Sequence, residues 1–308
     1  MLYFLSAMLY NADNFIYQLG VRFLKKALYW ILIAVFSVVF IVSAVIVGKY
    51  MIASHQYKQE MSDIQQLHSV PVTRPAPSLR LPTIDVVNPT LTPNPTGPDG
   101  TEPPFRPTQP DGTTASGMLP EMEELYALNN DVVGYIYVPG TNINYPVLQR
   151  TTEKDYYLYR DIYCKRKDHG SIYVREACDV FDPSDNVTIY GHNMADGSMF
   201  AGVLKFKNRT FFKEHQLIYF DTLYERHIYQ IVCIFRTSGD YGVGFPYHLY
   251  DNFKDEAEFK EFIKGIRALA IRDSGISVKY GDKFICLSTC EERPIKNGRL
   301  VLLAVRIS

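Results

Sequence analysis

Two residues in the second half of the sequence combine a reactive side chain with a position where a strand gives way to a loop. Cys290 ends the run KFICLSTC and is followed by the polar segment EERP, and His192 follows the β-branched and aromatic run VTIYG. Loops at strand ends are where a rigid scaffold presents reactive groups, and a nucleophilic thiol needs solvent access and an acid–base partner. Cys290 and His192 are therefore candidates for a nucleophile and its partner, although a histidine after a strand is more often an ordinary loop residue.

The other four cysteines do not have the spacing of a metal site. Cys233 and Cys286 lie in the apolar runs IVCIF and FICLS, where cysteine acts as a small hydrophobe. Cys164 and Cys178 lie in more polar surroundings, and a disulfide between them is an open alternative. Because the sequence has no CxxC motif, a zinc site is not expected. We predict no metal ion and no cofactor.

The elements that must position Cys290 and His192 lie in residues 119–308, where only five prolines follow Pro120. A region of this size can bury a single sizeable core. Short runs rich in β-branched and aromatic residues recur between turn signals and predict strands. These runs are 134–138, 143–148, 171–175, 187–190, 217–220, 228–236, 283–287 and 300–307. Eight such runs predict a mainly β fold, either a barrel or a sandwich.

Helices are predicted at three places among these strands. In DEAEFKEFIKGIRALAIRDS (255–274) the apolar residues fall at helical spacing, with acidic residues in the first turn and an arginine in the last. Shorter helices are predicted at 121–128 and around 199–205.

A membrane anchor is predicted near the N-terminus. Residues 27–47 form a run of 21 without a charge, and about 20 apolar residues span the hydrocarbon core of a bilayer. A cleaved signal peptide, the alternative, would have a shorter apolar run and a small-residue cleavage site. Arg22, Lys25 and Lys26 precede the run. The positive-inside rule therefore predicts a cytoplasmic N-terminus, although Lys49 and Lys58 weaken the contrast.

A proline-rich segment separates the anchor from the strands. Residues 71–120 hold 13 of the 18 prolines and few large apolar side chains, so we expect an extended, disordered spacer. Residues 48–70 either prolong the membrane helix or form a short stalk, and the sequence does not decide between these alternatives.

Composition limits the classes of function. The 32 basic and 33 acidic side chains give a formal net charge of −1, and no long run of one sign occurs, so a nucleic-acid partner is not expected. A hydrophobic content of 47% excludes a chain that is disordered throughout.

Three motifs together resemble the sortase family. They are YGHNMADGSMF (190–200), ICLSTC (285–290) and NGRLVLLAV (297–305). The resemblance covers most of residues 119–308 and is strongest to class B, because DVVGYIYVPGTNINYPVLQ (131–149) is similar to the opening segment of that class. In the TLxTC signature Cys286 replaces the usual first threonine, a minor departure.

The family's arginine, near the start of the last strand, matches Arg299. Arg293 is too close to Cys290, and Arg306 lies near the far end of the strand.

The resemblance implies a sortase-type eight-stranded β-barrel with peripheral helices, preceded by an N-terminal transmembrane helix and a Pro-rich spacer. The expected organisation is a short cytoplasmic segment (1–26), the transmembrane helix (27–47), an extracellular stalk and disordered spacer (48–118) and a sortase catalytic domain (119–308). The expected location is the membrane of a Gram-positive cell, with the catalytic domain outside.

The resemblance also implies a cysteine transpeptidase mechanism. The Cys290 thiolate attacks the threonine carbonyl of a C-terminal sorting signal and holds the acyl group as a thioester. His192 protonates the leaving amine and later accepts a proton from the incoming amine, while Arg299 donates to the substrate carbonyls or to the oxyanion. The implied partners are secreted proteins with a sorting signal and a cell-wall precursor that supplies the amine.

Three residues beside Cys290 are further candidates. Thr289 is a candidate contributor to the oxyanion hole, and Ser288 and Glu291 are candidates for substrate contact. The alternative is strand-end packing for Ser288 and Thr289, and a solvated loop charge for Glu291. The aromatic stretch YGVGFPYHLY (241–250) forms either a wall of the substrate groove or part of the core.

Other functions stay open at this point. A pilin-polymerising sortase would use a lysine of another subunit as the acceptor. A papain-like protease would place its cysteine before its histidine, the reverse of the order here, and would hydrolyse without needing an amine. An anchored binding domain without catalytic activity would form no covalent adduct at Cys290.

Overall fold

The computed structural model describes residues 2–68, 79, 117–240, 242–291 and 293–308. The chain forms two compact units, Met1–Glu60 and Met61–Ser308. The predicted spacer lies outside the described residues over 69–78 and 80–116, so its disorder stays a prediction.

The described residues of the first unit all lie in one long helix, α1 (Leu2–Leu67), which continues into the second unit. From Leu28 onward this helix is long and apolar enough to cross a membrane, and its apolar side chains, such as Phe36 and Phe40, are exposed. The chain stays helical through residues 48–67. Of the two alternatives for this segment, the prolonged helix is therefore the one that forms.

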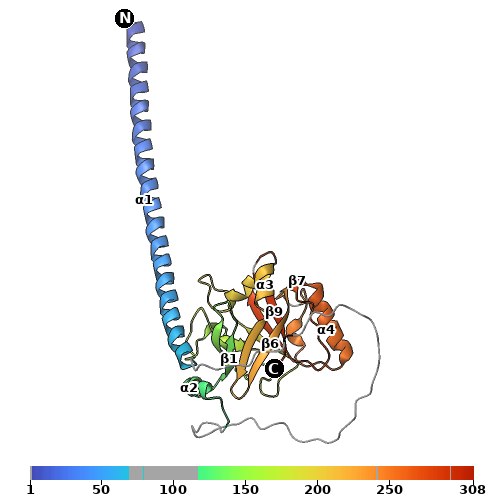
Figure 1. Ribbon diagram of the computed structural model, residues 1–308. Helices are drawn as coiled ribbons and strands as arrows, with labels where there is room; N and C mark the ends of the chain where they lie inside the picture. Colours follow the sequence, from blue (N-terminus) through green and yellow to red (C-terminus); the bar gives the residue numbers. More distant parts are fainter. Residues whose placement is uncertain (1, 69–78, 80–116, 241, 292) are drawn as a thin grey trace, which may run out of the picture. The chain divides into compact units, whose positions relative to one another are not determined.

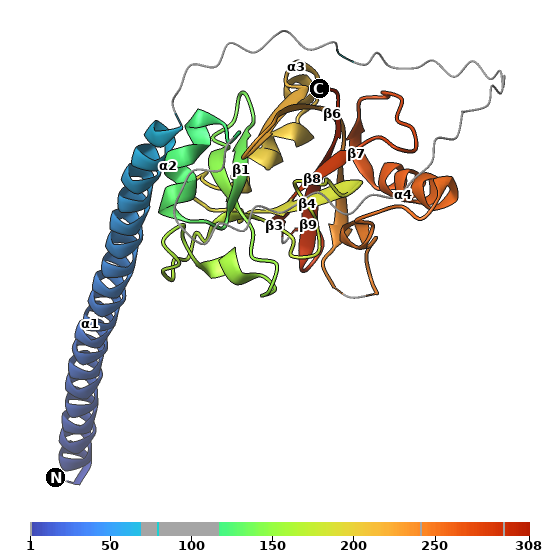
Figure 2. The same cartoon turned by 90° about the horizontal axis from the view of Figure 1, so that it is seen from below.

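The second unit is built on a closed β-barrel of eight strands (Figures 1 and 2). Around the barrel the strands follow the order β5-β1-β2-β3-β4-β8-β9-β6, and β6 pairs with β5 to close it. A further strand, β7, pairs with β6. The strands are β1 (Val132–Tyr137), β2 (Asn144–Leu148), β3 (Ile172–Val174), β4 (Asn186–Tyr190), β5 (Leu217–Thr222), β6 (Arg226–Ser238), β7 (Ala270–Asp273), β8 (Phe284–Cys290) and β9 (Gly298–Arg306). The predicted barrel is confirmed.

Helices flank the barrel. Two of them differ from the sequence predictions, one in its type and one in its length. The elements are α2 (Pro120–Leu128), η1 (Tyr156–Tyr159), η2 (Phe200–Lys207), α3 (Arg209–Glu214), η3 (Tyr247–Leu249) and α4 (Glu256–Ala268). The helix expected around 199–205 is the 3₁₀ helix η2. The helix expected over 255–274 ends at Ala268, because the following residues pair with the edge of β6 and become β7. Tertiary pairing overrides the local helical pattern there.

Both faces of β8 are covered. Phe284 and Cys286 pack in one buried cluster with Phe262 of α4, which lies alongside β7 (Figure 2). Alternation turns Ile285 and Leu287 to the opposite face, and both are fully buried. A strand that is buried on both faces reads as a continuous apolar run. The strand that ends at Cys290 is therefore held rigidly by the core.

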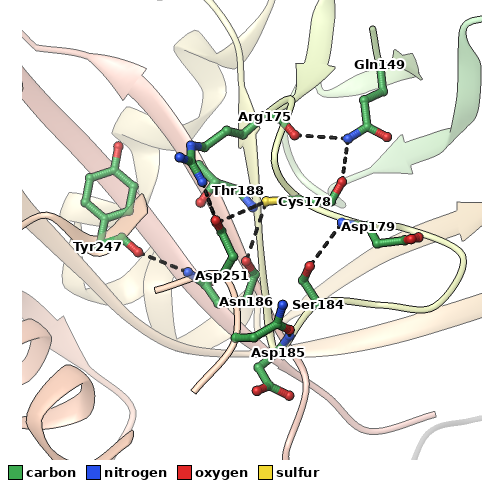
Figure 3. A network of polar contacts seen from close by, with 11 residues as sticks. Gln149, Arg175, Cys178, Asp179, Ser184, Asp185, Asn186, Thr188, Tyr247 and Asp251 are labelled. Atoms are coloured by element: carbon green, nitrogen blue, oxygen red, sulfur yellow. Dashed lines mark hydrogen bonds and ion pairs between the residues drawn. The ribbon is translucent and has the colours of Figure 1, made fainter. Parts of the chain in front are cut away.

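A polar network joins β4 and the residues that precede it to the segment that follows β6 (Figure 3). Arg175 Nη1 pairs with Asp251 Oδ1 at 2.7 Å, and the Cys178 thiol donates to the same oxygen at 3.4 Å. Burial raises the pKa of Cys178 to about 12, so the thiol stays protonated and serves as a donor. Asn186 of β4 donates to the carbonyl of Tyr247 at 3.1 Å.

The disulfide considered between Cys164 and Cys178 is not present in the structure. Cys178 is a free, buried thiol and Cys164 is a free, exposed one, so the disulfide considered between them does not form.

We expect Asp251→Ala to lower the free energy of unfolding by about 2–4 kcal/mol, because Arg175 would stay largely buried without its counter-charge. Lys260→Gln is the matched control, since it removes the exposed pair with Glu256 on α4 and should change the free energy by less than about 0.5 kcal/mol. Chemical denaturation of the full chain in detergent, followed by near-ultraviolet circular dichroism, measures both. Equally small changes would contradict a stabilising role for the network.

Candidate active site

Cys290 and Arg299 face each other on neighbouring strands. They are Cα partners in the antiparallel pair β8–β9, and directly opposed residues in such a pair project to the same face. Both residues are half-buried. Arg306 lies at the other end of β9, opposite Tyr229. Of the two arginines on β9, Arg299 is therefore the one beside Cys290.

Strand β4 brings His192 to the same strand end. β4 runs parallel to β8, with Tyr190 as the Cα partner of Ser288. His192 follows two residues after the end of β4. One hydrogen bond joins the two strand exits, because Asn193 Nδ2 donates to the carbonyl of Cys290 at 3.0 Å. The ends of β4 and β8, which lead to His192 and Cys290, therefore lie side by side.

The ring of His192 has a defined orientation. Its Nε2 lies 2.7 Å from the carbonyl oxygen of Leu158. A carbonyl oxygen only accepts, so Nε2 carries a hydrogen and Nδ1 is the nitrogen that gains or loses a proton. The ring of Tyr159 lies against the imidazole, with ring centroids 5.3 Å apart.

Burial lowers the pKa of His192. The hydrogen bond to Leu158 opposes this shift, whereas positive charge on His169 and Arg299 adds to it. The neutral imidazole is therefore favoured at pH 7, and the imidazolium, when it forms, is a stronger acid than an ordinary histidine.

Ser288 and Thr289 are buried and bonded within the protein. They are 1% and 2% exposed. The Ser288 hydroxyl pairs with the Tyr247 hydroxyl at 2.6 Å, and the Thr289 hydroxyl donates to the carbonyl of Gly191 at 2.7 Å. These bonds fix the strand that carries Cys290, and the role of either residue toward substrate stays a prediction.

Glu291 is not a solvated loop charge. Its carboxylate lies 2.5 Å from Lys207 Nζ and 2.6 Å from Arg236 Nε. Burial opposes its ionisation, but the hydrogen bonds from Arg236 and Lys207 outweigh burial and lower the pKa of Glu291. The carboxylate therefore ties the chain just after Cys290 to η2 and β6.

Several contributors could not be recognised from the sequence. Tyr247 lies in the aromatic stretch 241–250 and is 3% exposed, so this tyrosine belongs to the core. The acceptor for His192 is a backbone carbonyl, which leaves no sequence signal. His169 is an isolated histidine in the sequence, and the structure packs the next residue, Gly170, against the Leu158 carbonyl that accepts from His192. Within the described ranges, no group of three or more His, Cys, Asp or Glu side chains could hold a metal ion.

The chain is similar to known proteins of one family. A family model described as the sortase domain matches residues 136–307. Sortase B of Listeria monocytogenes is 30% identical over 185 residues, which cover 59% of this chain and 72% of that protein. Sortase B of Staphylococcus aureus is 27% identical over 188 residues, which cover 61% of this chain and 75% of that protein.

A solved structure gives the same result for the fold. The complex of Staphylococcus aureus sortase B with a substrate superposes with a TM-score of 0.57 at 27% identity, covering 63% of this chain and 87% of that one. The matched family region includes the barrel strands from β2 to β9 and the strand ends that carry His192, Cys290 and Arg299. The chain therefore belongs to the sortase family of transpeptidases, within class B.

Proposed function

We propose that this chain is a membrane-anchored cysteine transpeptidase that cleaves a C-terminal sorting signal at threonine and transfers the protein to a cell-wall amine. The observation that carries the proposal is the meeting of Cys290, Arg299 and His192 at one end of three adjacent strands. In this proposal α1 crosses the membrane, the N-terminus is cytoplasmic and the barrel lies outside the cell.

Two steps make up the proposed reaction. The Cys290 thiolate attacks the carbonyl carbon of the threonine, a thioester forms, and the amine that leaves takes a proton from the His192 imidazolium. The incoming amine then attacks the thioester and gives a proton to the neutral imidazole, and the thiolate leaves. The cysteine thereby splits one difficult amide exchange into two easier steps.

Arg299 is proposed to donate to the oxygen that becomes negative in both steps. A Cβ atom on Gly239 would lie 3.0 Å from Arg299 Cζ, so the backbone after β6 packs against the guanidinium. A guanidinium held in this way presents several fixed donors, whereas the ammonium of lysine is a point charge on a flexible stem. Fixed donors near developing charge are a main source of catalysis.

Cys290→Ala should abolish both cleavage and transfer, because no thioester can form without the sulfur. Mass spectrometry of a sorting peptide incubated with the full chain in detergent measures both products. Cys164→Ala, which removes the exposed thiol of another loop, is the control and should retain activity. Release of product by folded Cys290→Ala protein would rule out the proposed nucleophile.

Arg299→Lys should lower kcat by about 10²–10³-fold, the loss typical of removing an oxyanion donor, while circular dichroism shows an unchanged fold. Arg306→Lys makes the same exchange at the other end of β9 and should leave kcat unchanged. Equal rates for Arg299→Lys and the parent enzyme would contradict the donor role.

The full chain with NPxTN-like and LPxTG-like peptides should form a Cys290 thioester that resolves onto an added amine, with NPxTN-like peptides preferred because of the class B resemblance. Products and acyl-enzyme are followed by mass spectrometry, with and without cell-wall-like amines and lysine-containing peptides. Preference for a lysine side chain would replace cell-wall anchoring with pilin polymerisation. Hydrolysis at a rate that amines do not change, without a ligated product, would contradict transfer.

A further inference from the structure

A second histidine, His169, has no part in the proposed chemistry. His169 Nε2 lies 3.3 Å from Asp196 Oδ2, and the two side chains are 8% and 7% exposed. The other oxygen of Asp196 accepts from the backbone N–H of Ser198 at 3.0 Å and from its hydroxyl at 2.5 Å. A buried carboxylate with these partners is fixed in place, and it holds the ring of His169 with it.

The loop of residues 157–171 brings Gly170, the residue after His169, next to the hydrogen-bond acceptor of His192. Gly170 has a φ of +57°, and a Cβ atom there would lie 2.2 Å from the carbonyl oxygen of Leu158. That same oxygen accepts from His192 Nε2. Only glycine allows this approach, so the backbone directly after His169 packs against the atom that orients His192.

Asp196 belongs to the segment on the other side. It lies four residues after His192, in a turn that folds back on itself, because the N–H of Phe200 donates to the carbonyl of His192 at 2.8 Å. Asn193 and Met199 form a β-bridge across the same turn. The contact between His169 and Asp196 therefore joins the segment that carries His192 to the segment that accepts its hydrogen bond.

Charge reaches His192 from several elements. His169 and Arg299 lower its pKa and Asp168 raises it, with His169 the strongest of the three. Tyr159 faces the ring, and Cys290 ends the neighbouring strand.

We propose that His169 and Asp196 form a positioning pair for His192, in which their contact joins the segment that carries His192 to the segment whose carbonyl orients its ring. A ring fixed in this way keeps Nδ1, the nitrogen that gains or loses the proton, in a defined place. This inference rests on the proposed role of His192 as proton carrier, yet its effect on the His192 ring can be measured without turnover.

Titration of the His192 ring by NMR measures the effect of the pair. The full Cys290→Ala chain, labelled with ¹³C-histidine in detergent micelles, is followed from about pH 4.5 to 8.5, where histidines change charge. The midpoint of the His192 signal in this chain is the reference for the His169→Gln variant.

His169→Gln removes the titrating ring but keeps an amide nitrogen that can donate to Asp196. We expect the midpoint of His192 to rise by about half a pH unit, because His169 lowers the pKa of His192 in the intact protein. His227→Gln is the matched control: His227 is buried on β6 with its Nε2 3.3 Å from Glu225 Oε2, and its loss should leave His192 unchanged. An unchanged or lowered midpoint in folded His169→Gln protein would overturn the pair.

Failure of the proposed function has a different signature. A fully active His192→Gln enzyme would remove His192 from the proposed reaction and would not bear on the contact between His169 and Asp196. An inactive His192→Gln enzyme, together with an unchanged His192 midpoint in folded His169→Gln protein, would overturn the positioning pair alone.

Discussion

Strand β8 pairs with parallel β4 on one side and antiparallel β9 on the other. Because side chains alternate along a strand, a slip of one residue in the β8–β9 register would turn Cys290 and Arg299 to opposite faces. Burial of both faces prevents this slip, since Phe284 and Cys286 fill one apolar cluster and Ile285 and Leu287 are buried on the other side. The geometry of the strand end is thus a consequence of packing several residues away from it.

The polar side chains of Ser288, Thr289 and Glu291 at this strand end form hydrogen bonds and ion pairs within the protein. The hydroxyl of Ser288 bonds to Tyr247, and the hydroxyl of Thr289 bonds to Gly191. The carboxylate of Glu291 bonds to two cations from η2 and β6. Each bond links β8 to a different segment, so the loop after Cys290 starts from a fixed position. Precise placement of a nucleophile requires this kind of support from neighbouring residues.

Much of this architecture is predictable from local pattern, and the exceptions have physical causes. The eight barrel strands are recognised by β-branched runs between turn signals, and His192 and Cys290 by their places at strand ends. Strand β7 was missed because its sequence continues a helical pattern, and its strand form depends on the edge of β6. The burial of Ser288 depends on Tyr247, 41 positions away. The Leu158 carbonyl is a backbone group that every residue has, so only the folded chain singles it out.

The five thiols differ in how they would meet an oxidant. Oxidation proceeds through the thiolate and requires access to the sulfur. Burial raises the pKa values of Cys178, Cys233 and Cys286, and all three are enclosed by the core. An oxidant would therefore meet Cys164 and Cys290 first. The chain can in this way carry three cysteines as packing groups that the core shields from damage.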